Sequence, residues 1–139
     1  MKLIVCGLSD GKSCVLEEVD CTPSNDEMST QAIFEMKLDA LPPRPPGLGD
    51  FLDIPVEPGE MKWFRVGFAP NQHWDTHHTD TIDFHTIVSG SIDLVLDDGP
   101  HRLEAGDSAV VAGVDHAWHT GPDGCATSII IFGTPKPAA

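Results

Sequence analysis

The residues of this chain best suited to chemistry are its histidines, and all seven lie between His73 and His119. They gather mainly in two clusters, each next to a glycine turn. Residues 73–90 hold four histidines together with Asp83, and residues 106–119 hold two more. Imidazoles and carboxylates that come together from two strands can hold a divalent metal ion. An imidazole can also move protons near neutral pH.

The composition describes one acidic domain. The 139 residues are 40% hydrophobic, and 22 acidic against eight basic residues give a net charge of −14. A chain of this size can bury a real core. Its charge repels nucleic acid and anionic lipid, so we expect neither as a partner. The apolar run at residues 3–6 is too short for a signal peptide or a membrane span, so we expect a cytoplasmic protein.

Short apolar runs separated by Gly, Pro, Asn and Asp predict an all-β fold. The expected strands lie at residues 3–6, 15–19, 31–38, 61–68, 82–88, 91–96, 101–104, 108–111, 117–119 and 126–132. Short strands at regular spacing are typical of a sandwich or a barrel. The first two strands are expected to form a hairpin.

We expect one structural domain with two parts. Residues 1–59 supply N-terminal strands and a proline-rich loop that pack on a barrel formed by residues 60–139. Four prolines and two glycines at residues 41–50 exclude regular structure there and indicate a rigid crossing loop.

The first histidine cluster ends at Gly90 with a definite spacing. Asp83 lies seven residues before this glycine, His78 lies five before Asp83, and Thr76 lies two before His78. This arrangement resembles the first motif of the cupin superfamily, Gly-x5-His-x-His-x3-4-Glu-x6-Gly, with Thr76 at the first histidine and Asp83 at the glutamate. His77 is the neighbour of Thr76, so a one-residue bulge would restore a pair of histidines.

The second cluster supports the same resemblance. Gly106, Gly113 and His116 match the second cupin motif, Gly-x5-Pro-x-Gly-x2-His-x3-Asn, with one residue fewer between the glycines. The resemblance covers about residues 60–132, and the string at residues 77–83 is similar to that of small single-domain cupins. It implies a double-stranded β-helix, which is a jelly-roll barrel, and a homodimer.

The resemblance and strand alternation together indicate a metal site with His78, Asp83 and His116 as ligands, and with His77 or His85 as a further ligand. Two imidazoles and one carboxylate would suit iron, zinc or manganese. A metal-free pocket of hydrogen-bonded histidines is the alternative. Asp83 and His85 share one face of their strand, so we expect both to act in catalysis, His85 as a general base.

Three further residues are expected at a small-molecule substrate. Trp118 shares a strand face with His116, and Thr76 lies beside the first histidine cluster. Arg65 could clamp a carboxylate if its strand faces the barrel, whereas a surface ion pair is the alternative. His73, His101 and His119 are expected at the rim or on the outside, away from the site.

These features predict a small-molecule metalloenzyme of the cupin type. Metal-assisted lyase, decarboxylase, isomerase or cyclase chemistry on a carbonyl- or carboxylate-bearing metabolite is the leading hypothesis. The alternatives are an iron-dependent dioxygenase and a non-catalytic cupin that binds a small ligand without metal. The apolar residues Ile82, Phe84 and Val88 would suit a homodimer interface or a second layer of the same domain.

Overall fold

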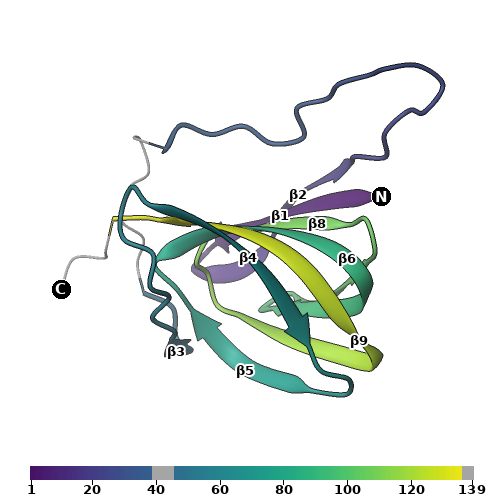
Figure 1. Ribbon diagram of the computed structural model, residues 1–139. Helices are drawn as coiled ribbons and strands as arrows, with labels where there is room; N and C mark the ends of the chain where they lie inside the picture. The colour runs from purple at the N-terminus through teal and green to yellow at the C-terminus, as the bar shows by residue number, and fades with distance from the viewer. Residues whose placement is uncertain (39–45, 136–139) are drawn as a thin grey trace.

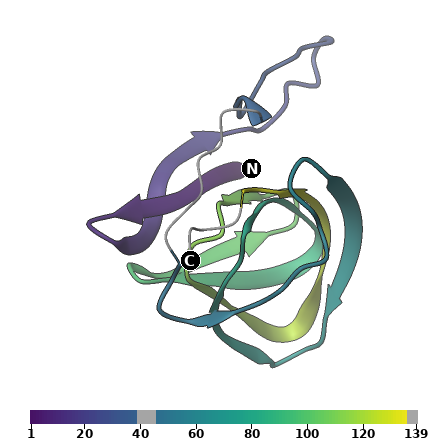
Figure 2. The ribbon, with the colours of Figure 1, turned by 90° about the vertical axis from the view of Figure 1, so that its left-hand side faces the viewer.

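The computed structural model describes residues 1–38 and 46–135, and its regular elements there are β-strands (Figure 1). The strands are β1 (Lys2–Ser9), β2 (Lys12–Asp20), β3 (Asp50–Phe51), β4 (Met61–Phe68), β5 (His73–His78), β6 (Thr81–Leu96), β7 (Gly99–Glu104), β8 (Ser108–Val111) and β9 (His116–Gly133). They form one sheet that curls into a barrel (Figure 2). The predicted all-β barrel is confirmed. No helix in the described part of the chain is long and apolar enough to cross a membrane.

Two long strands, β6 and β9, organise this barrel. The first half of β6 pairs with β8 and with the second half of β9. The second half of β6 pairs with β7 and with the first half of β9. β4 and β5 extend opposite halves of β9. The two halves of the barrel therefore share their longest strands, as the predicted double-stranded β-helix requires.

Glycines allow these strands to bend from one half of the barrel to the other. Gly90 in β6 and Gly124 in β9 have φ angles of 71° and 65°. A Cβ atom on Gly90 would collide with the carbonyl oxygen of Gly124. Only glycine combines a positive φ with so close an approach. The sequence predicted a strand break at each of these places, whereas the chain continues as one bent strand through both.

The N-terminal hairpin belongs to the same sheet. β1 pairs with β2 in antiparallel fashion, as predicted, and pairs with β8 in parallel fashion. Fully buried Leu94, Leu103 and Val111 lie in the large apolar cluster inside the barrel. Burial of each such side chain stabilises the fold by roughly 1.5–3 kcal/mol.

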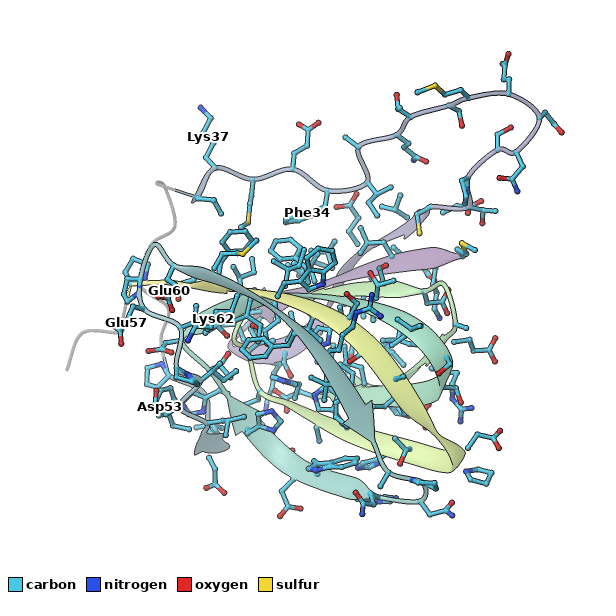
Figure 3. The ribbon with its side chains drawn as sticks, in the orientation of Figure 1. Phe34, Lys37, Asp53, Glu57, Glu60 and Lys62 are labelled. Carbon is cyan, nitrogen blue, oxygen red and sulfur yellow. The ribbon has the colours of Figure 1, made fainter. Side chains whose placement is uncertain are left out.

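The strand predicted at residues 31–38 is wrong, because this segment contributes side chains to the fold without joining the sheet. Ile33, Phe34 and Met36 pack on the outer apolar cluster, and the rings of Phe34 and Phe84 are 5.6 Å apart. Phe34 points toward the sheet while Lys37 points away from it (Figure 3). The chain itself therefore covers the outer face around Phe84, which agrees with the second-layer alternative.

The segment between β3 and β4 is held against the barrel by a lysine. The Lys62 Nζ atom donates a hydrogen bond of 2.6 Å to the carbonyl oxygen of Pro55 and lies 3.6 Å from a Glu60 carboxylate oxygen (Figure 3). Val56 from this segment is buried with Ile129 and Ile131 of β9. Leu52 and Ile54 of the same segment line the cavity described next.

Candidate functional site

The barrel contains a pocket of about 410 Å³. Asp83 and His85 enter it from β6, His77 from β5 and His116 from β9. Apolar side chains make up most of the remaining wall, and they include Phe68, Trp74 and Trp118. A cavity of this size with a few polar groups is typical of a small-molecule site.

A bulge in β5 decides which histidine reaches the pocket. Trp74 pairs with Trp118 and His77 with His116, so three steps along β5 match two along β9. An extra residue of this kind reverses the alternation of the side chains that follow it. Trp74 and His77 consequently both line the pocket, whereas Thr76 is exposed.

His78 therefore lies outside the pocket, contrary to the ligand set His78, Asp83 and His116 that the sequence indicated. Its Nδ1 atom is 3.7 Å from the Asp115 Oδ1 atom, and its ring centroid is 5.5 Å from that of Phe51. The bulged alternative, with His77 facing inward, describes the observed arrangement.

Asp83 is a buried carboxyl group with an altered acidity. It is 4% exposed, and its Oδ1 atom accepts a hydrogen bond of 2.6 Å from the Thr81 hydroxyl. Burial raises the pKa of Asp83 to about 7, and the hydrogen bond from Thr81 opposes part of this rise. A carboxyl group that is near half-ionised at neutral pH is well suited to both give and take a proton.

His85 stands beside this carboxyl group without a hydrogen bond of its own. Its Nε2 atom is 3.9 Å from the Asp83 Oδ2 atom, and neither ring nitrogen has a partner among the described residues. Burial, with a smaller effect of nearby His116, lowers the pKa of His85 to about 3, so the ring is neutral. An unpaired buried polar group costs about 1–3 kcal/mol, and a ligand in the pocket could supply the missing bonds.

His77 and His116 are held in a common way. Their Nδ1 atoms lie 2.9 Å and 2.7 Å from the carbonyl oxygens of Asp75 and Val114, which makes each Nδ1 the donor and leaves each Nε2 atom as an acceptor. Burial lowers the pKa of His116 to about 4, and nearby His77 adds to this effect. The two ring centroids are 4.3 Å apart.

Metal-ligating histidines are oriented in the same way, with one ring nitrogen held by a backbone carbonyl. Within residues 1–38 and 46–135, however, no group of three or more His, Cys, Asp or Glu side chains is arranged to hold a metal ion. Asp83 accepts a hydrogen bond from Thr81, and His78 lies against Asp115 outside the pocket. The donor set therefore does not fit the three-ligand site that the sequence indicated.

Comparison with known proteins gives two kinds of similarity. No family model matches the chain. Phomopsin biosynthesis cluster proteins D and C' from Diaporthe leptostromiformis are 40% identical over 75 residues (53% of this chain, 36% of that protein) and 49% identical over 62 residues (44% and 33%). The chain spans about a third of the length of these curated relatives.

The second kind of similarity concerns the fold. A Rhizobium leguminosarum protein of unknown function aligns with a TM-score of 0.51 at 16% identity, over 54% of this chain and 72% of that one. A cupin domain of a transcriptional regulator from Enterobacter cloacae aligns with a TM-score of 0.46 at 18% identity, over 54% and 83%. The pairing of β6 with β9 gives this chain the cupin-type jelly-roll fold that the sequence predicted. The glycines Gly106 and Gly113 that matched the second cupin motif have positive φ angles of 91° and 75°.

The remaining predicted site residues are divided between the pocket and the surface. Trp118 is 5% exposed and lines the pocket, with its ring centroid 4.9 Å from that of His85. Arg65 is exposed on the outside of β4, because the alternation of that strand turns Val66 and Phe68 inward. Arg65 therefore does not supply the carboxylate clamp considered from the sequence.

The other three histidines lie away from the pocket. His73 and His119 stack on each other with ring centroids 3.9 Å apart, and His101 pairs with Asp98 at 2.7 Å. Neither pair lines the cavity.

The sequence analysis did not identify the residues that support the site. Thr79 and Thr81 alternate with Asp83 along the chain, and their hydroxyl oxygens are 2.9 Å apart. That alternation was a usable signal for a hydroxyl next to the carboxyl group. Asp115 gave no such signal, since it accepts hydrogen bonds from the backbone amides of Leu48 (2.8 Å) and Gly49 (3.1 Å), far away in the sequence. These bonds hold residues 48–52 at the pocket, where Phe51 and Leu52 line it.

Proposed function

We propose that this cupin is an enzyme that moves a proton at a carbon atom next to a carbonyl group of a small molecule. Asp83 is the acid and base, and neutral His85 donates a hydrogen bond to the carbonyl oxygen. The observation that carries this proposal is the pair itself: a buried carboxyl group with a pKa of about 7 beside a buried imidazole whose two nitrogens have no hydrogen-bond partner among the described residues. Strongly shifted groups in a pocket mark functional sites.

The proposed step balances without a further reactant. The Asp83 carboxylate takes the proton, the C–H electron pair forms a C=C bond, and the carbonyl oxygen becomes an enolate oxygen. The N–H of His85 hydrogen-bonds to that oxygen as its charge grows. A neutral imidazole with a lowered pKa is suited to this role because it keeps a proton to share without carrying a charge into the pocket.

The fate of the enolate sets the reaction class. Return of the proton from Asp83 to a different atom gives an isomerase, and loss of a group from the neighbouring carbon gives a lyase. Attack by the enolate carbon on a second carbonyl group of the same molecule gives a cyclase. We place this chemistry in the biosynthesis of a natural product, because both curated relatives are named as phomopsin biosynthesis cluster proteins.

The test uses a simple enolisable ketone, 2-acetylnaphthalene, in D2O. The enzyme should speed the exchange of methyl hydrogens for deuterium, followed by NMR, and Asp83→Asn should lower the enzymatic rate about 100-fold. Asp123→Asn removes the same charge from an exposed position of β9 and should exchange at the wild-type rate. Equal rates for the wild-type protein and Asp83→Asn would overturn the proposal.

A metal-dependent reaction is a second candidate, favoured by one observation. His77 and His116 both direct Nδ1 to a backbone carbonyl, the arrangement that orients metal-ligating histidines. Iron, zinc and manganese suit such donors. Stoichiometric iron with oxygen uptake would support a dioxygenase, and zinc or manganese without oxygen uptake would support a metal-assisted lyase or isomerase. Ligand binding without any turnover would support the non-catalytic alternative.

A further inference from the structure

The apolar wall of the pocket combines aliphatic and aromatic side chains, and its aromatic part reaches the proposed catalytic pair. The Phe68 ring meets Trp74 edge-on with centroids 5.0 Å apart, and its centroid is 6.0 Å from that of Trp118. Trp118 in turn contacts His85, with centroids 4.9 Å apart. Ile129 extends the apolar lining. A flat apolar molecule against these rings would thus have its far end beside His85.

The charges around the pocket are unsuited to an anion. Asp50 and Asp75 line it and are exposed, and Asp83 lies inside. No lysine or arginine among residues 1–38 and 46–135 lines it. Arg65, which the sequence suggested as a carboxylate clamp, is exposed on the outer face of β4. A carboxylate or phosphate in this pocket would lose its water without gaining a counter-ion, which is strongly unfavourable.

We propose that the substrate is a neutral molecule in which an enolisable ketone is attached to a flat aromatic ring system. The rings lie against Phe68, Trp74 and Trp118, and the ketone lies at Asp83 and His85. This assignment rests on the proposed function for the position of the ketone. It narrows the substrate classes considered from the sequence, since a carboxylate-bearing metabolite no longer fits the pocket.

Binding of two matched probes to the wild-type protein tests the class of ligand. 2-Acetylnaphthalene is neutral, and 2-naphthoate has nearly the same shape but carries a negative charge. The ketone should bind at least about tenfold more tightly than the carboxylate, measured by calorimetry at pH 7.5. Equal binding of the two probes, or tighter binding of 2-naphthoate, would overturn the proposal.

A pair of tryptophan variants tests where the rings lie. Trp74 is half-buried in the pocket wall, whereas Trp63 is 65% exposed on the outer side of β4 and bonds to Ser128. Trp74→Leu should weaken 2-acetylnaphthalene binding about tenfold, while Trp63→Leu should leave it unchanged. The proposal fails if Trp74→Leu binds like the wild type, or if both variants lose affinity equally.

The two proposals can fail separately. Selective binding of the ketone without deuterium exchange would keep the ligand class and refute the proposed function. Exchange that depends on Asp83, together with equal affinity for 2-naphthoate, would keep the function and refute the ligand class. Trp118 is not used as a variant because it belongs to the large buried cluster, where a smaller side chain would disturb folding.

Discussion

Asp83→Asn should stabilise the protein above neutral pH and leave its stability unchanged in acid. Burial raises the pKa of Asp83 from 3.8 to about 7, so the folded protein binds this proton more tightly than the unfolded chain does. The resulting stabilisation is complete below the unfolded pKa and is lost as the pH rises through the folded pKa. Asparagine carries no charge at any of these pH values, and its side-chain oxygen can still accept the Thr81 hydrogen bond.

The magnitude follows from the size of the pKa shift. Roughly three pH units at about 1.4 kcal/mol each give about 4 kcal/mol of destabilisation in the wild-type protein above pH 7. Because Asp83 is only 4% exposed, solvent screening reduces this figure little. It is an upper bound for Asp83→Asn, because the new amide must also be desolvated. Below about pH 4 the difference should approach zero.

Two neighbouring histidines make stability depend on pH in the opposite direction, and their effect is the same in the wild-type protein and in Asp83→Asn. Burial lowers the pKa of His85 to about 3 and that of His116 to about 4, so their contribution to stability is lost as the pH falls below the unfolded value of 6.5. Both proteins share this loss. The difference in unfolding free energy between them therefore reports on Asp83.

Urea unfolding, followed by tryptophan fluorescence at pH 4, 5.5 and 8, measures the effect. The gain in unfolding free energy from Asp83→Asn should grow with pH, while the exposed control Asp123→Asn should stay within about 0.5 kcal/mol of the wild type throughout. A gain that is the same at all three pH values, or a loss at pH 8, would refute the conclusion that burial raises the pKa of Asp83.

Further predictions concern the same site. His85→Leu should lower the deuterium exchange rate about 100-fold, because the hydrogen bond to the enolate oxygen is lost. It should not lower stability, since it removes two buried nitrogens that lack hydrogen-bond partners among the described residues. The exchange assay and urea unfolding measure the two effects. The exchange rate should rise with pH through about 7 as Asp83 ionises, and a profile flat from pH 5 to 9 would contradict this role. Asp115→Ala should weaken 2-acetylnaphthalene binding several-fold and speed amide exchange at Leu48 and Gly49, as mass spectrometry would reveal. EDTA should leave ketone exchange within about twofold, because the proposed step uses only side chains; loss restored by iron, zinc or manganese would favour the second candidate.

The parts of the fold that depend on local pattern were predictable. Alternation at residues 61–68 predicted a strand that the structure has as β4, with Phe64, Val66 and Phe68 on the more buried side. The segment at residues 31–38 failed because apolar side chains such as Phe34 signal burial, and burial alone does not require a strand. A strand also needs a partner for its backbone, and this segment packs only its side chains.

The site was partly predictable for the same reason. Alternation placed Asp83 and His85 on one face of a strand, and both line the pocket. The choice between His77 and His78 depends on a bulge, which is fixed by the pairing of β5 with β9 and has no local signature. The altered acidity of Asp83 also follows from burial in the assembled barrel, a property that no window of the sequence contains.

The two halves of the barrel share β6 and β9, and this sharing limits which local opening motions the molecule can make. Because β6 and β9 each run through both halves, the halves could part only if the hydrogen bonds between these two strands broke, and such an opening approaches global unfolding in cost. Residues 48–52 are attached far more weakly, by the two amide bonds to Asp115 and a short pairing with β5. Exchange of ligand with solvent should accordingly proceed by lifting this edge, at a frequency independent of the stability of the whole protein.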